Sequence, residues 1–109
     1  MSYYDLYGFK AKDINLVKEV IEASLNIKMN DHGHDSDYSD GYFMCEFDSG
    51  EEFVLNDNYD EGEQDYRETE YQGFPVLLYV NESTEEKVKK YESALLANEG
   101  VELLRREEL

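Results

Sequence analysis

Residues 74–106 decide the fold, and they read FPVLLYVNESTEEKVKKYESALLANEGVELLRR. Residues 74–81 are almost wholly apolar, which predicts a central strand buried on both faces of a sheet. Pro75 suits the first position of that strand, where a missing N–H group is tolerated. VELLRR, residues 101–106, predicts a final strand, so a helix should connect the two.

The helix signal between these strands is a capping box. Ser83 is the expected N-cap and Glu86 its partner, so we expect a helix over residues 84–98 that stops before Gly100. Its apolar face should carry Val88, Tyr91 and Leu95.

The N-terminal residues predict a strand, a helix and the start of a second strand. SYYDLYGF, residues 2–9, has the aromatic content of a strand. Asp13 is the expected N-cap of a helix that ends at Asn26, and residues 27–29 would begin the next strand. The apolar stripe of this helix recurs at three- and four-residue steps: Ile14, Val17, Ile21 and Leu25.

The middle of the chain predicts one hairpin between two loops. Residues 31–41 are polar and contain two glycines, which is typical of a loop. Residues 42–47 and 52–56 are rich in strand-forming residues, and the turn-forming residues 48–51 join them. Residues 57–73 show no apolar period, and they predict a long surface loop.

The expected order of elements is therefore β-α-β-β-β-β-α-β within a single domain, residues 1–109. The fold class this order favours is α+β, a mainly antiparallel sheet with two helices packed on one face, in the split β-α-β style.

Charge narrows the possible partners. The chain has 109 residues and a net charge of −17. Residues 31–70 contain fifteen acidic residues and a single basic one, Arg67, so this block carries most of the net charge. Such a protein repels nucleic acid and anionic membranes, and we expect neither as a partner.

The compartment follows from cysteine content and hydropathy. Cys45 is the one cysteine, which excludes a disulfide framework and fits a reducing environment. No apolar run approaches the ~18 residues of a membrane span. We expect a cytoplasmic protein.

Catalytic and metal-binding patterns are weak. His32 and His34 are the only histidines, and even with Cys45 they lack the spacing of a known metal motif. The acidic stretches miss the glycine and ligand spacing of a calcium loop. We therefore expect no enzyme, no catalytic residues, no metal and no cofactor.

The function that remains after these exclusions is binding to another protein. Tyrosines supply rigid contact area, and carboxylates accept bidentate bonds from arginine. The expected partner-binding residues are Glu51, Glu52, Asp57, Tyr59, Asp60, Glu61, Glu63, Asp65 and Tyr66. A possible second group is Asp35, Asp37 and Asp40.

Four segments carry a family resemblance: YYDLYGF (3–9), GYFMCEF (41–47), EEFVLNDNYD (51–60) and FPVLLYVNES (74–83). In size, element order and charge, the chain resembles the small acidic immunity proteins of bacterial contact-dependent growth inhibition and other polymorphic toxin systems. The resemblance implies a cytoplasmic protein, monomeric when free, that binds one cognate toxin domain, often a nuclease, and blocks its active site. The acidic binding residues are assigned from their position in this chain and not from the family.

Three alternatives stay open. A DNA mimic would present carboxylates at roughly phosphate spacing to a DNA-binding protein. An acidic adaptor would bind through an apolar strand edge or the helices. The acidic block would otherwise serve only as a solubilising face.

Overall fold

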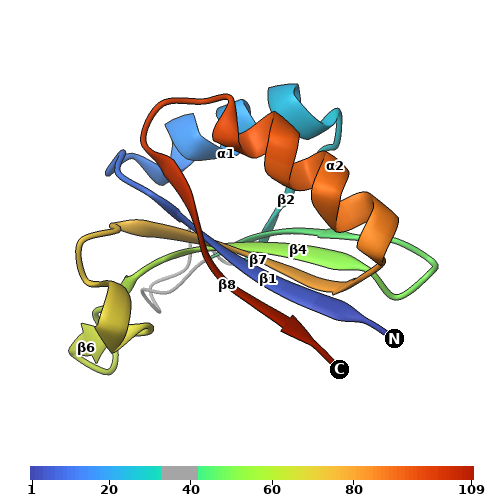
Figure 1. The fold of residues 1–109 in the computed structure, drawn as a ribbon. Helices are drawn as coiled ribbons and strands as arrows, with labels where there is room; N and C mark the ends of the chain where they lie inside the picture. Colours follow the sequence, from blue (N-terminus) through green and yellow to red (C-terminus); the bar gives the residue numbers. More distant parts are fainter. Residues whose placement is uncertain (33–41) are drawn as a thin grey trace.

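A computed structural model describes residues 1–32 and 42–109, which form an antiparallel sheet with two helices over one face (Figure 1). The elements are β1 (Tyr3–Phe9), α1 (Ile14–Leu25), β2 (Asn30–His32), β3 (Tyr42–Glu46), β4 (Glu52–Asp57), β5 (Tyr59–Asp60), β6 (Asp65–Tyr66), η1 (Thr69–Tyr71), β7 (Val76–Ser83), α2 (Glu85–Leu96) and β8 (Val101–Glu108). Across the described part of the chain, the main sheet has the order β2-β3-β4-β7-β1-β8, and β5 pairs with β6 separately. The predicted α+β class is confirmed.

The split β-α-β arrangement is present in the C-terminal half. β7 and β8 each pair antiparallel with β1, one on either side. They therefore run parallel to each other with β1 inserted between them, and α2 connects them across the sheet.

The main core lies between the helices and the sheet. Leu78 of β7 and Phe53 of β4 are buried in it. The helices bury one stripe each, as their periodicity predicts: Ile14, Val17 and Ile21 of α1, and Val88 and Leu95 of α2. Among residues 1–32 and 42–109, no helix is long and apolar enough to cross a membrane.

The second face of the sheet is also covered near β7, which confirms a central strand buried on both faces. Leu77 points away from the helices and is fully buried. Phe74 lies over β1 on this side, and a Cβ at Gly8 would meet the Phe74 ring at 2.6 Å. The close approach explains why position 8 is a glycine. The strand itself begins at Val76, one residue after the predicted Pro75.

α1 begins and ends where the sequence predicts. The Asp13 carboxylate accepts a hydrogen bond from the Asn15 N–H at 2.9 Å, which caps the first turn. Asn26 ends the helix with φ 55°, in the left-handed region that asparagine tolerates.

The predicted start of α2 is wrong by one residue. Thr84 is the N-cap, and its hydroxyl accepts a hydrogen bond from the Lys87 N–H at 3.3 Å. Ser83 is instead the last residue of β7, and its hydroxyl donates to the buried carboxylate of Glu51. The predicted cap, Ser83, therefore makes a tertiary hydrogen bond to Glu51 and does not cap the helix.

The predicted end of α2 is also late. The helix ends at Leu96, and the Asn98 side chain donates to the carbonyls of Ala94 and Leu95. Gly100 has φ +78° and lies in the turn just before β8, so it positions that strand and does not stop the helix directly.

The second strand begins later than predicted. In residues 27–29 the Met29 N–H donates to the Glu22 carboxylate of α1 at 2.8 Å, so it is not available to a strand partner. The strand lies at Asn30–His32, and it pairs with β3. The first two residues of the predicted loop 31–41 therefore belong to β2, and the remainder of that loop lies outside the described residues.

The hairpin of β3 and β4 is confirmed, but the long loop predicted over residues 57–73 is wrong. This segment contains β5, β6 and η1. Figure 1 shows the small hairpin on the opposite side of the sheet from the helices, at one end of the sheet.

Candidate functional site

The small hairpin of β5 and β6 carries two packed tyrosines. Tyr59 pairs with Tyr66 across the strands, with ring centroids 5.2 Å apart and planes at 71°. This is the edge-to-face geometry that aromatic pairs prefer. Tyr59 remains 45% exposed, a large value for an aromatic side chain in a fixed position. We call residues 59–66 the tyrosine hairpin.

Carboxylates hold the turn of the tyrosine hairpin. Asp60 accepts hydrogen bonds from the N–H groups of Gly62 and Glu63 at 3.0 and 3.2 Å. Asp65 accepts one from the Tyr66 N–H at 2.7 Å. Asp60 and Asp65 thus have a local structural task.

Asn58, immediately before the hairpin, anchors it to the sheet. It is fully buried, and both its backbone and its side chain are hydrogen-bonded. Its partners, at 2.7–3.0 Å, are the carbonyls of Tyr71, Phe74 and Pro75 and the N–H groups of Arg67 and Glu68. Asn58 therefore joins the start of the hairpin to the residues just after the hairpin and to the segment that leads into β7. Nothing in the local sequence pattern distinguishes Asn58 from its polar neighbours.

A second anchor joins η1 and its approach to the C-terminal strands. Glu68 accepts from the Tyr79 hydroxyl at 2.7 Å and from Arg105 at 3.1 Å. Burial, and then the hydrogen bond to Glu68, raise the pKa of Tyr79, so this hydroxyl stays protonated as a donor. The Tyr71 hydroxyl donates to the Leu104 carbonyl at 3.1 Å. These hydrogen bonds hold the segment that follows the hairpin against β7 and β8.

A surface pocket of about 610 Å³ opens beside the tyrosine hairpin. The tyrosine hairpin and Asp57 contribute acidic and aromatic side chains, and the other lining residues come from the segment after η1 and the turn before α1. The lining residues are Lys12, Asp57, Tyr59, Glu61, Tyr66, Gln72, Gly73 and Pro75. Four predicted binding residues, Asp57, Tyr59, Glu61 and Tyr66, thus line one pocket.

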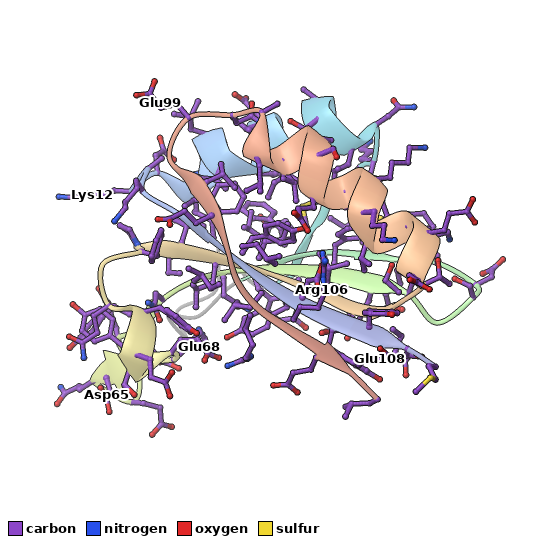
Figure 2. The ribbon with its side chains drawn as sticks, in the orientation of Figure 1. Lys12, Asp65, Glu68, Glu99, Arg106 and Glu108 are labelled. Carbon is purple, nitrogen blue, oxygen red and sulfur yellow. The ribbon has the colours of Figure 1, made fainter. Side chains whose placement is uncertain are left out.

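The remaining predicted hairpin residues lie close by. Asp60 faces a neighbouring hollow of about 360 Å³ and forms an ion pair with Arg67 at 3.5 Å. Glu63 and Asp65 are exposed near the hairpin turn, and Figure 2 shows Asp65 at the outer end of the molecule. The structure therefore brings the predicted residues from 57 to 66 together.

The structure separates Glu51 and Glu52 from that group. They lie at the other end of β4 from Asp57, across a strand of six residues, or roughly 17 Å at the usual rise per residue. Glu52 is half-buried and accepts a hydrogen bond from Asn81 at 3.0 Å.

Glu51 is 2% exposed, so its assignment to the partner-binding surface is wrong for this structure. Its carboxylate accepts from the hydroxyls of Ser83 and Tyr91 and lies 3.7 Å from the Lys87 ammonium. Burial, and then the hydrogen bond to Glu51, raise the pKa of Tyr91. Glu51 therefore ties the β3–β4 turn to α2.

The second predicted group, Asp35, Asp37 and Asp40, lies outside the described residues, as does His34. Cys45 is buried, and burial raises the pKa of its thiol. Within residues 1–32 and 42–109, no three acidic, histidine or cysteine side chains gather as a metal site would require.

Comparison with protein families, with curated proteins and with solved structures finds no match to this chain.

Proposed function

We propose that this protein is an immunity protein that binds a cognate bacterial toxin domain, a basic nuclease, and occludes its active site with the tyrosine hairpin. The observation that carries this proposal is the exposed, edge-packed tyrosine pair, held on an anchored hairpin among carboxylates. Tyrosine is enriched among residues that dominate binding energy, because it buries a large area at low entropic cost.

Charge supports a basic partner. Residues 57–66 contain five acidic side chains and no basic ones. A nuclease active site holds lysine and arginine for phosphate, so its field attracts this surface at long range and accelerates association. Tyr59 then slows release, because its ring becomes buried at the centre of the contact.

Anchoring supports inhibition by a rigid body. A flexible loop would lose conformational entropy when it bound, whereas the hydrogen bonds of Asn58 restrict the hairpin before binding. We place the protein in the cytoplasm, where the buried free thiol of Cys45 stays reduced.

The test uses the C-terminal domain encoded by the gene directly upstream of this one, where an immunity gene would have its toxin. The wild-type chain should inhibit that domain at one-to-one stoichiometry. Glu61→Lys/Glu63→Lys should slow association on the order of tenfold at low salt. Both side chains are exposed and neither holds the hairpin turn, so the fold should remain intact.

The matched control is Glu19→Lys/Glu99→Lys, which makes the same change in net charge elsewhere. Both residues are exposed, and Figure 2 shows Glu99 far from the tyrosine hairpin. Equal slowing by the two double variants would mean that net charge alone steers association. No complex with the upstream domain, together with capture of several DNA-binding proteins, would favour the DNA mimic instead.

A further inference from the structure

We propose that the pocket beside the tyrosine hairpin is a receptor for an arginine side chain of the protein partner. This inference rests on the proposed function, since it names the group through which a basic partner docks. The pocket measures about 610 Å³, within the range of about 300–1,000 Å³ that ligand sites occupy.

The tyrosine pair selects a planar cation. Tyr59 and Tyr66 both line the pocket, and their edge-to-face packing holds the two rings at 71° to each other. The face of an aromatic ring is negative and attracts a cation placed over it. Arginine is favoured over lysine, because a guanidinium stacks on aromatic rings and is less strongly hydrated than an ammonium.

The same pocket offers the Glu61 carboxylate to the guanidinium edge. Asp57 and Glu61 line it together with the tyrosines. A carboxylate can accept two parallel N–H bonds from one guanidinium, a geometry that an ammonium cannot match. A phosphate or other anion would meet these carboxylates as like charges, so we exclude anions as occupants.

The rest of the pocket lining comes from outside the tyrosine hairpin. Lys12, Gln72, Gly73 and Pro75 complete it. Figure 2 shows the Lys12 side chain extending outward from the turn between β1 and α1.

The test needs no toxin. N-acetyl-arginine amide is titrated into the isotope-labelled full chain and followed by NMR at the amides of Glu61, Tyr66 and Gly73. We expect saturable shifts confined to the pocket, weaker with N-acetyl-lysine amide and absent with the uncharged citrulline analogue. Tyr59→Ala should weaken arginine binding about two- to fivefold, the range of an exposed cation–π contact.

The paired variants separate a pocket from general attraction to an acidic surface. Glu61→Gln should weaken arginine binding, whereas Glu70→Gln removes the same charge from an exposed position of η1 outside the pocket and should leave it unchanged. Equal shifts with arginine and lysine, shifts spread over the whole acidic surface, or no saturation would each overturn the pocket.

The arginine pocket and the proposed inhibition of a nuclease can be tested separately. Arginine binding without inhibition of the upstream domain would keep the pocket and reject the nuclease inhibitor. Full inhibition by a Tyr59→Ala/Glu61→Gln chain with wild-type kinetics would reject the pocket and the tyrosine hairpin as the docking site, while the chain would remain an inhibitor through another surface.

Discussion

At the scale of single residues, Ser83 and Thr84 have different roles at the start of α2. The local pattern predicts Ser83 as the cap, but Thr84 caps the helix and Ser83 binds Glu51. Ser83 sits three residues before Glu86, the spacing of a capping box. Thr84 has the extended backbone of an N-cap, with φ −107° and ψ 160°, and its oxygen meets the first turn of α2. Ser83 turns inward, because the buried carboxylate of Glu51 requires a donor.

We expect Thr84→Ala to lower the free energy of unfolding by about 1 kcal/mol, because it removes the cap of α2. Ser93→Ala, at an exposed position within the same helix, should be close to neutral. Chemical denaturation of both variants measures the difference. Equal losses would show that the Thr84 hydroxyl does not cap the helix.

At the scale of elements, the tyrosine hairpin is too small to be stable by itself. It has two residues in each strand, and isolated two-stranded hairpins are marginal in water. Its order comes from its base, where Asn58 is buried with its amide bonded to Tyr71, Phe74 and Glu68. The hairpin is therefore a separate two-stranded unit that Asn58 anchors to the segment leading into β7.

We expect Asn58→Ala to loosen the hairpin while β7 stays protected. The variant loses three part-buried hydrogen bonds between the Asn58 amide and the backbone, at a cost of about 1–3 kcal/mol. Hydrogen exchange should accelerate at the amides of Tyr66 and Arg67 far more than at Leu78.

Gln72→Ala is the control, because this amide side chain is exposed in the same segment. It should leave exchange at the hairpin unchanged. Uniform acceleration across hairpin and core in Asn58→Ala would contradict a local anchor.

At the scale of the whole molecule, repulsion among carboxylates opposes folding. The chain carries 27 acidic and 10 basic residues, so most carboxylates can have no cation of their own. Some are paired well: Arg106 bonds Asp5 at 2.8 and 2.9 Å and Glu92 at 2.9 Å, which ties β8 to β1 and α2. Salt screens exposed charges more than partly buried pairs like these.

We therefore expect moderate salt to raise the midpoint of thermal unfolding. The Debye length falls from about 30 Å at 0.01 M to about 10 Å at 0.1 M, which weakens repulsion across the acidic segment. Differential scanning calorimetry over this range measures the rise. Replacing Glu61, Glu63 and Glu70 with glutamine should make the rise smaller, and a flat or falling midpoint in the wild-type chain would contradict the prediction.

Sequence alone determined the features that depend on neighbours along the chain. The order of the main-sheet strands and the two helices along the chain, the Asp13 cap, the hairpin of β3 and β4 and the doubly buried β7 follow from periodicity, caps and turns, which act within a few residues. Net charge and the acidic block between residues 31 and 70 are likewise properties of composition. Composition also grouped Asp57, Tyr59 and Tyr66 as candidate binding residues, but the hairpin that pairs the two tyrosines was not predicted.

Only the tertiary structure decided which acidic residues lie at the surface and which are buried. Glu51 and Asp57 are six positions apart, yet one is buried and the other lines the pocket. The burial of Glu51 depends on Ser83 and Tyr91, 32 and 40 residues away, and no local pattern carries that contact. Asn58 anchors the hairpin through residues 9 to 17 positions further on, and no local pattern carries those contacts either. Burial and long-range hydrogen bonds arise when distant segments meet, so only the folded chain separates buried carboxylates from exposed ones.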